Sequence, residues 1–209
     1  MRRYYMKYSE SLHPQTVIEN VVDMDMWANR IWVNHKQGLY FIPIWRNANT
    51  QFMNISEQFE FTLDLQPDVS NYTGFVFVRH PFNRIAGQYW RAMANRNWTL
   101  EKITEKMLDG QVDDPHFDTQ SSFITPWPRP DYYINLDDIQ HTGHTFIDNI
   151  IDTIIDQKSK KISALENSSI EEYVISNTEV QRLVEKYFAA DFEMFLEHFP
   201  DTHKLMDKI

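Results

Sequence analysis

Cysteine is absent from the 209 residues of the chain. Disulfide bonds, thiolate metal sites and a cysteine nucleophile are therefore excluded. Long apolar runs are also absent, and none approaches the roughly 20 residues that a membrane-spanning helix requires. The first ten residues, MRRYYMKYSE, contain two arginines, but no apolar segment of a secretory signal follows them. These absences predict a cytoplasmic protein without a membrane span.

Positive charge is scarce. Lysine and arginine total 20 against 30 acidic residues, which gives a formal net charge of −10. Binding along a nucleic-acid backbone or to an anionic membrane is therefore disfavoured. An anionic small ligand would need a local positive cluster, so the positions of the arginines are informative. Hydrophobic residues make up 42% and aromatic residues 14%, which predicts a folded globular protein.

Apolar patterning predicts an α/β protein formed by one domain over residues 1–209. Residues 1–35 give no clear pattern. Strands are expected at 38–45, 59–65, 75–78 and 131–139, and helices at 50–58, 81–95, 99–110, 146–156 and 169–198. Because strands alternate with helices, we expect a mainly parallel sheet that is covered by helices on both faces.

Two strand-to-helix loops contain arginines. The stretch FVFVRHPFNRIAGQYW begins as a buried strand and becomes helical at Pro81, with Arg79 and Arg84 at the junction. The earlier loop, IWRNANTQF, places Arg46 ahead of Thr50. Carboxyl ends of parallel strands and helix N-termini are where α/β sheets bind anions. Two such sites side by side suit a nucleoside with phosphates at both ends, although each arginine alone could also form a structural ion pair.

These segments resemble the sulfotransferases that use 3′-phosphoadenosine 5′-phosphosulfate (PAPS), in particular the carbohydrate O-sulfotransferase branch, family 2. RNANTQ at 46–51 is similar to the K-x-A-x-T-S part of the family's first motif. VRHPFNRIAGQY at 78–89 is similar to its second motif, V-R-D-P-F-x-R-L-x-S-x-Y. PHFDTQ at 115–120, DYYINLDDI at 131–139 and the closing helix VEKYFAADFEMF follow in the family's order. The resemblance therefore covers most of the chain.

The resemblance implies a P-loop-like nucleotide-binding fold, with a nucleotide-binding core at 36–140 and a C-terminal helical part at 141–209. PAPS would be the sulfuryl donor, 3′,5′-adenosine bisphosphate (PAP) the product, and no metal would be needed. The acceptor would be a hydroxyl, most simply of a sugar. In the family the first motif holds the 5′-phosphosulfate and the second the 3′-phosphate. The implied cofactor-binding residues are Arg46, Asn47, Ala48, Asn49, Thr50, Gln51, Arg79, Arg84 and Gly87.

The chain departs from the family at three of these positions: Arg46, Gln51, which replaces the last serine of the first motif, and Gly87. Arg46 replaces the lysine that stabilises the leaving oxygen, which keeps the charge but changes its geometry. Gly87 replaces a serine and so lacks a hydroxyl donor. Gly87 is also predicted to lie inside a helix, where glycine costs about 1 kcal/mol relative to alanine.

A general base is needed to take the acceptor proton. Together with Arg46, we expect His116 to be catalytic, because an imidazole with a pKa near neutral suits proton transfer. Three carboxylates between the two motifs are alternatives: Glu57, Glu60 and Asp64.

Two other functions remain open on the sequence. The altered residues at 46 and 87 are compatible with a non-catalytic nucleotide-binding protein of the same fold. A kinase-like enzyme lacks a Walker lysine and has no clear magnesium ligand, unless Asp137 and Asp138 serve. The compact length, the absence of cysteine and the lack of an anchor differ from Golgi members of the family and predict a bacterial or viral relative.

Overall fold

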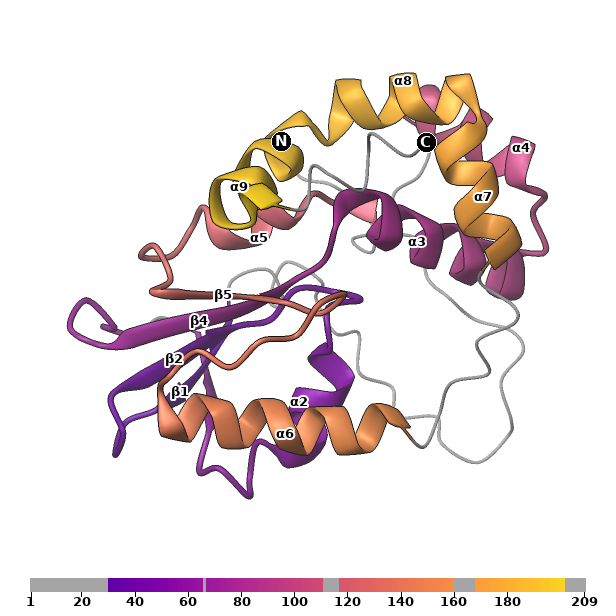
Figure 1. Ribbon diagram of the computed structural model, residues 1–209. Coiled ribbons are helices and arrows are strands. Elements are labelled where there is room, and N and C mark those ends of the chain that lie inside the picture. Colours follow the sequence, from indigo (N-terminus) through magenta and orange to yellow (C-terminus); the bar gives the residue numbers. More distant parts are fainter. Residues whose placement is uncertain (1–29, 66, 111–116, 160–167, 202–209) are drawn as a thin grey trace.

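The computed structural model describes residues 30–65, 67–110, 117–159 and 168–201, and Figure 1 shows their arrangement. A five-stranded sheet lies at the centre, with the strand order β3-β1-β2-β4-β5. The strands are β1 (Ile31–Asn34), β2 (Leu39–Ile42), β3 (Thr62–Asp64), β4 (Thr73–Val78) and β5 (Tyr132–Asn135). The α/β class predicted from the sequence is confirmed.

The sheet is mixed, so the prediction of a mainly parallel sheet is wrong for one half of it. β2, β4 and β5 are parallel neighbours. β1, which the sequence pattern did not reveal, is antiparallel to both β2 and β3. A short turn suffices to join antiparallel strands, and here it runs from Asn34 to Leu39 through Gly38, whose φ is +61°.

Helices cover both faces of the sheet (Figure 1). On one face, α2 (Asn49–Ile55) and α6 (Thr145–Ser159) pack on the aromatic rings of Phe41, Phe75 and Phe77. On the other face, α5 (Gln120–Ile124) and α9 (Ala189–His198) contribute to a second core. Alternate residues of β4 point to opposite faces, so both faces require apolar residues, and the continuous run Phe75–Val78 is explained.

A third core joins the helices that lie beyond the sheet: α3 (Pro81–Arg96), α4 (Leu100–Leu108), α7 (Ser168–Ser176) and α8 (Thr178–Tyr187). The bounds of α3 match the prediction closely. Thr99 caps α4, since its Oγ1 accepts a hydrogen bond from the backbone amide of Lys102.

The long C-terminal helix predicted over 169–198 is three helices, α7, α8 and α9. Asn177 interrupts the apolar pattern and caps α8, because its side chain accepts from the amides of Glu179 and Val180. None of the helices that the structure describes is long and apolar enough to cross a membrane.

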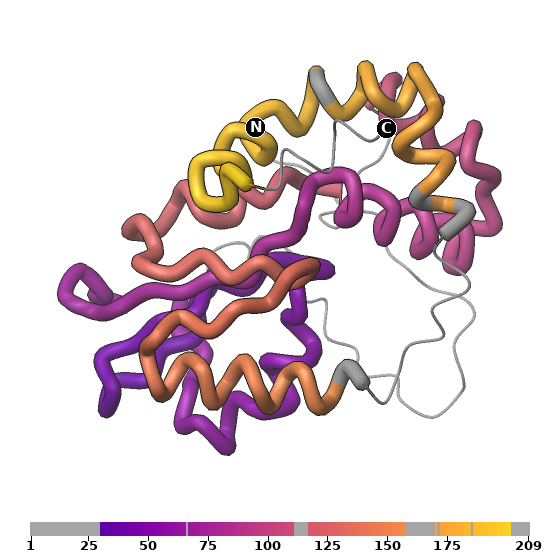
Figure 2. Tube along the Cα trace, viewed as in Figure 1, coloured from indigo at the N-terminus to yellow at the C-terminus, as the bar shows by residue number. Residues whose placement is uncertain are grey.

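The Cα trace in Figure 2 shows how distant segments meet at the sheet. β4 lies between β2 and β5, and all three run in the same direction. The carboxyl ends of these three strands therefore lie side by side at one end of the sheet, which we call the carboxyl edge. The chain leaves this edge through the loop to α2, the loop to α3 and the segment that follows β5.

Candidate functional site

Both arginine loops predicted from the sequence lie at the carboxyl edge. Ile42 at the end of β2 is in register with Val76 of β4. Arg46 follows β2 by four residues, and Arg79 follows β4 directly. The structure therefore brings the two loops together as neighbours, at the position where open α/β sheets bind ligands.

The backbone of the first loop is held in an uncommon conformation. Arg46 has a φ of 72° and Ala48 a φ of 58°, so two residues with a Cβ are left-handed within three positions. Each such residue costs on the order of 1 kcal/mol or more and persists where surrounding structure enforces it. The side chain of Arg46 leads out of this loop towards α3. There its Nη2 donates to the carbonyl of Gly87 at 2.7 Å, and its guanidinium lies 5.8 Å from the ring centroid of Trp90.

Arg79 is fixed by a carboxylate from the third parallel strand. Its Nε lies 3.2 Å from Asp137 Oδ1, two residues beyond β5. Asp137 also accepts a hydrogen bond of 2.8 Å from the His80 amide at the start of α3. One carboxylate thus orients both the arginine and the helix N-terminus, while about 30% of the arginine side chain stays exposed.

The two guanidinium groups converge on Gly87. A Cβ at this position would lie 3.5 Å from Arg46 Nη2 and 3.9 Å from Arg79 Nη1. Burial, together with the positive charges of Arg91 and Arg79, lowers the pKa of Arg46 to about 10. Arg46 stays protonated at neutral pH, so like charges are gathered at one place in a protein whose net charge is negative. Such a cluster favours the binding of an anion.

Arg84 is buried beneath this cluster, with 1% of its surface exposed. Arg84 therefore does not face solvent. Its Nε, Nη1 and Nη2 donate to no acceptor among the described residues. Burial lowers its pKa to about 10, against the opposing influence of Asp191 and Asp118. Arg84 therefore adds positive charge from below rather than a contact at the surface, and buried donors without acceptors are rare in folded proteins.

A buried amide connects the two loops. Gln120 Oε1 accepts from the Arg79 amide and from Asn47 Nδ2, and Gln120 Nε2 donates to the Arg79 carbonyl. The carboxylate of Asp191 on α9 in turn accepts hydrogen bonds from the backbone amides of Gln120 and Ser121, at 2.8 Å each. This network holds the first loop, the second loop and α5 in one fixed arrangement.

The remaining residues of the first motif differ in their orientation. Asn47 is fully buried and donates to the Phe77 carbonyl, so its side chain secures the loop instead of facing a ligand. Asn49 is the first residue of α2 and is also buried. Thr50 is exposed and Gln51 is partly exposed. Thr50 and Gln51 therefore have the accessible side chains of this segment.

The described candidates for a general base lie at different distances along the sheet from Arg46. Glu60 pairs with Lys36 at 2.9 Å, beside the β1–β2 turn, and Glu57 precedes it in the same segment. Both carboxylates lie at the amino end of β2, which is the end of the sheet away from Arg46. Asp64 ends β3 in register with Ile31, so it lies at the edge that carries Arg46. His116 lies outside the described residues.

Three residues near the arginines were not predicted as part of the PAPS site: Trp90, Asp137 and Asp191. Asp137 was considered only as a possible magnesium ligand, although it follows a third strand that was expected to be parallel to the other two. Trp90 lies three residues after Gly87, on the same side of α3. Asp191 lies in the closing segment that resembles the family, but the sequence did not indicate its partners, which are 70 residues or more away along the chain.

Comparison with known proteins gives no relative: no protein-family model, no curated protein and no solved structure matches the chain.

Proposed function

We propose that the chain is a PAPS-dependent sulfotransferase that transfers a sulfuryl group to an acceptor hydroxyl. The observation that supports this most strongly is the convergence of Arg46 and Arg79, from two neighbouring strand ends, around Gly87. Two arginine loops at one sheet edge suit a nucleotide with anionic groups at both ends. The order of the motifs along the chain adds the family resemblance to this geometry.

In the proposed complex, the two ends of the nucleotide occupy different loops. Arg79 binds the 3′-phosphate, and its orientation is fixed by Asp137. Arg46, Thr50 and Gln51 bind the 5′-phosphosulfate. Arg84 acts through its charge from beneath, since its guanidinium is buried. The loop after β2 would thus bind phosphate groups as a P-loop does, although it lacks the glycines and the lysine of a Walker sequence.

The reaction is an in-line displacement at sulfur. The acceptor oxygen forms a new S–O bond while the S–O bond to the 5′-phosphate breaks, and PAP leaves with the electron pair. Arg46 stabilises the charge that develops on the leaving oxygen. The acceptor proton passes to a base, for which His116 and Asp64 are the two candidates, because Asp64 shares the edge with Arg46. A sugar hydroxyl is the proposed acceptor.

Incubation with PAPS and a panel of sugars and other hydroxylated acceptors tests this function. Acceptor-dependent release of PAP, with a product heavier by one sulfuryl group, is expected. Binding of PAP without transfer to any acceptor would favour the non-catalytic nucleotide-binding protein. Arg129→Ala is a matched control, since Arg129 is an exposed arginine paired with Glu197 at 2.7 Å.

A further inference from the structure

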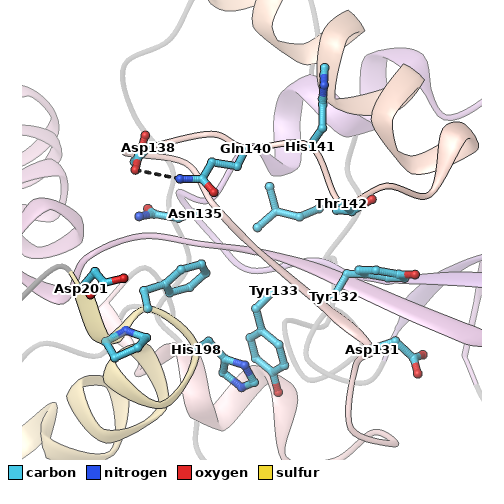
Figure 3. Close-up of a pocket in the computed structure, with 13 residues that line it drawn as sticks. Asp131, Tyr132, Tyr133, Asn135, Asp138, Gln140, His141, Thr142, His198 and Asp201 are labelled. Carbon is cyan, nitrogen blue, oxygen red and sulfur yellow. Dashed lines mark hydrogen bonds between the residues drawn. The ribbon is translucent and has the colours of Figure 1, made fainter.

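A cleft of about 430 Å³ runs along β5, the outermost strand on one side of the sheet (Figure 3). β5 is the last strand in the sheet order, and of the described strands it pairs with β4. The walls are formed by the segment that follows β5 and by the end of α9. Its volume lies in the range of small-ligand sites, which is about 300–1,000 Å³.

Aromatic rings from both faces of β5 line this cleft. Tyr133 packs on the α9 side, and its ring stacks on the imidazole of His198 with centroids 3.6 Å apart and planes 14° from parallel. Tyr132 points to the opposite face, where its ring meets His144 edge to face. The cleft therefore bends around the strand edge and offers flat ring surfaces to a ligand.

Polar groups surround these rings. Asp138 and Gln140 are exposed and hydrogen-bonded to each other, and Figure 3 shows them at the same end of the cleft as Asn135. Thr142 lies on the side of Tyr132, away from Asp138. Carboxylate, amide and hydroxyl groups together can both accept and donate hydrogen bonds, which an apolar ligand would leave without partners.

The charges of the cleft exclude two ligand classes. No lysine or arginine occurs among its described lining residues. Arg129 interacts with the Tyr133 side chain, but it is paired with Glu197, so the carboxylates would repel an anion. The carboxylates are also dispersed, with Asp131 at the end away from Asp138 and Asp201. Asp131 is already engaged by the Gly74 amide at 2.8 Å. Within the described residues, no group of three or more His, Asp or Glu side chains could hold a metal ion. The described residues of the cleft therefore offer no cluster of ligands for a compact cation.

We propose that the cleft along β5 binds a neutral saccharide, with the Tyr133–His198 pair against the sugar ring and Asp138 and Gln140 hydrogen-bonded to its hydroxyls. This site is separate from the arginine cluster. Asp137 lies between them, bound to Arg79 on one side and followed by Asp138 on the other. A saccharide here could be held while a nucleotide occupies the arginine loops, but its binding does not require the proposed transferase activity.

Saturation-transfer difference NMR of the full chain with lactose, maltose and cellobiose, without nucleotide, tests this proposal. We expect at least one disaccharide to bind. Asp138→Ala and Gln140→Ala should each weaken it roughly five-fold, as expected for one lost hydrogen bond. Both residues are exposed, so these variants should fold even if His198→Ala, which removes the ring stack, does not.

Two controls separate this site from other effects. His35→Ala removes a different histidine–tyrosine pair, His35 with Tyr72 at 3.1 Å, and should leave saccharide binding unchanged. Arg46→Ala should also leave it unchanged, so a failure of the proposed transferase function would not affect this result. The proposal is overturned if none of the disaccharides binds at millimolar concentration, if the Asp138 and Gln140 variants bind as well as the wild type, or if spermidine displaces the sugar and binds more tightly.

Discussion

Arg46 donates a hydrogen bond of 2.7 Å to the carbonyl of Gly87, and so connects the loop after β2 to the second turn of α3. This contact places the guanidinium where its charge adds to that of Arg79. It also fixes the arginine from one side, because a backbone carbonyl accepts one of its five N–H groups. In the proposed complex, the other donors of Arg46 would bind the 5′-phosphosulfate.

Replacement of Arg46 should affect the chemical step more than binding. If it stabilises the leaving oxygen, Arg46→Ala should lower kcat by about a hundred-fold or more while PAP affinity changes less. Arg46→Lys keeps a positive charge and should retain substantial activity. Because the pKa of Arg46 is lowered only to about 10, its charge should not limit the rate between pH 6 and 9. Steady-state kinetics with PAPS over that range measure this, and a loss of PAP affinity equal to the loss of kcat would argue against the assigned role.

Arg79→Ala should weaken PAP far more than adenosine 5′-phosphosulfate, which has no 3′-phosphate. A charge-assisted hydrogen bond is worth about 1.5 to 3 kcal/mol, so the preference for PAP should fall roughly ten-fold or more. Titration of both nucleotides by calorimetry gives the two affinities. Equal losses would assign Arg79 to a structural pair with Asp137. Arg129→Ala is the control for removing an arginine from the surface.

Gly87 offers a test in which affinity is gained. A Cβ at this position makes ordinary contacts of 3.5 Å or more, so a small side chain fits. Gly87→Ala should raise the free energy of unfolding by up to about 1 kcal/mol, since glycine is unfavourable within a helix. Gly87→Ser adds a hydroxyl beside both arginines and should bind PAP several-fold more tightly than Gly87→Ala. If the two variants bind PAP equally, the 3′-phosphate does not lie at Gly87.

Arg84→Met separates a binding role from a structural one. The buried guanidinium donates to no acceptor among the described residues, so an apolar side chain of similar length should fill its place at little cost in thermal stability. PAP affinity should nevertheless fall, because a positive charge below the loops is lost. Thermal unfolding with and without PAP measures both effects. A large drop in Tm with an unchanged shift by PAP would make Arg84 the structural counter-ion of Asp191.

The sequence predicted the parts of the fold in which local pattern and tertiary environment agree. β4 and α3 follow from an apolar run that ends at a proline, and Arg79 follows from its position at that junction. β1 was missed because its four residues, Ile31–Asn34, gave no distinct pattern ahead of the turn. The burial of Arg84 was not predictable either, since it shares the inner face of α3 with Gln88 and both are polar.

The site was predicted in part for the same reason. Strand ends indicated where Arg46 and Arg79 would lie, but not which way each residue of the first loop would point. Asn47 turns inward because Gln120 and the Phe77 carbonyl bind its amide, and Gln120 lies 73 residues further along the chain. Contacts of this separation carry no periodic pattern, and the same holds for Asp191.

The most direct test of the account is calorimetric titration of the wild-type chain with PAP at low salt, in the presence of a chelator. Because Arg46, Arg79 and Arg84 supply the positive charge, PAP should bind with micromolar or better affinity without any metal ion. Binding should weaken as salt is added, since charged contacts are screened. The absence of PAP binding at low salt, or binding that requires Mg²⁺, would contradict the assignment of the arginine cluster to this nucleotide.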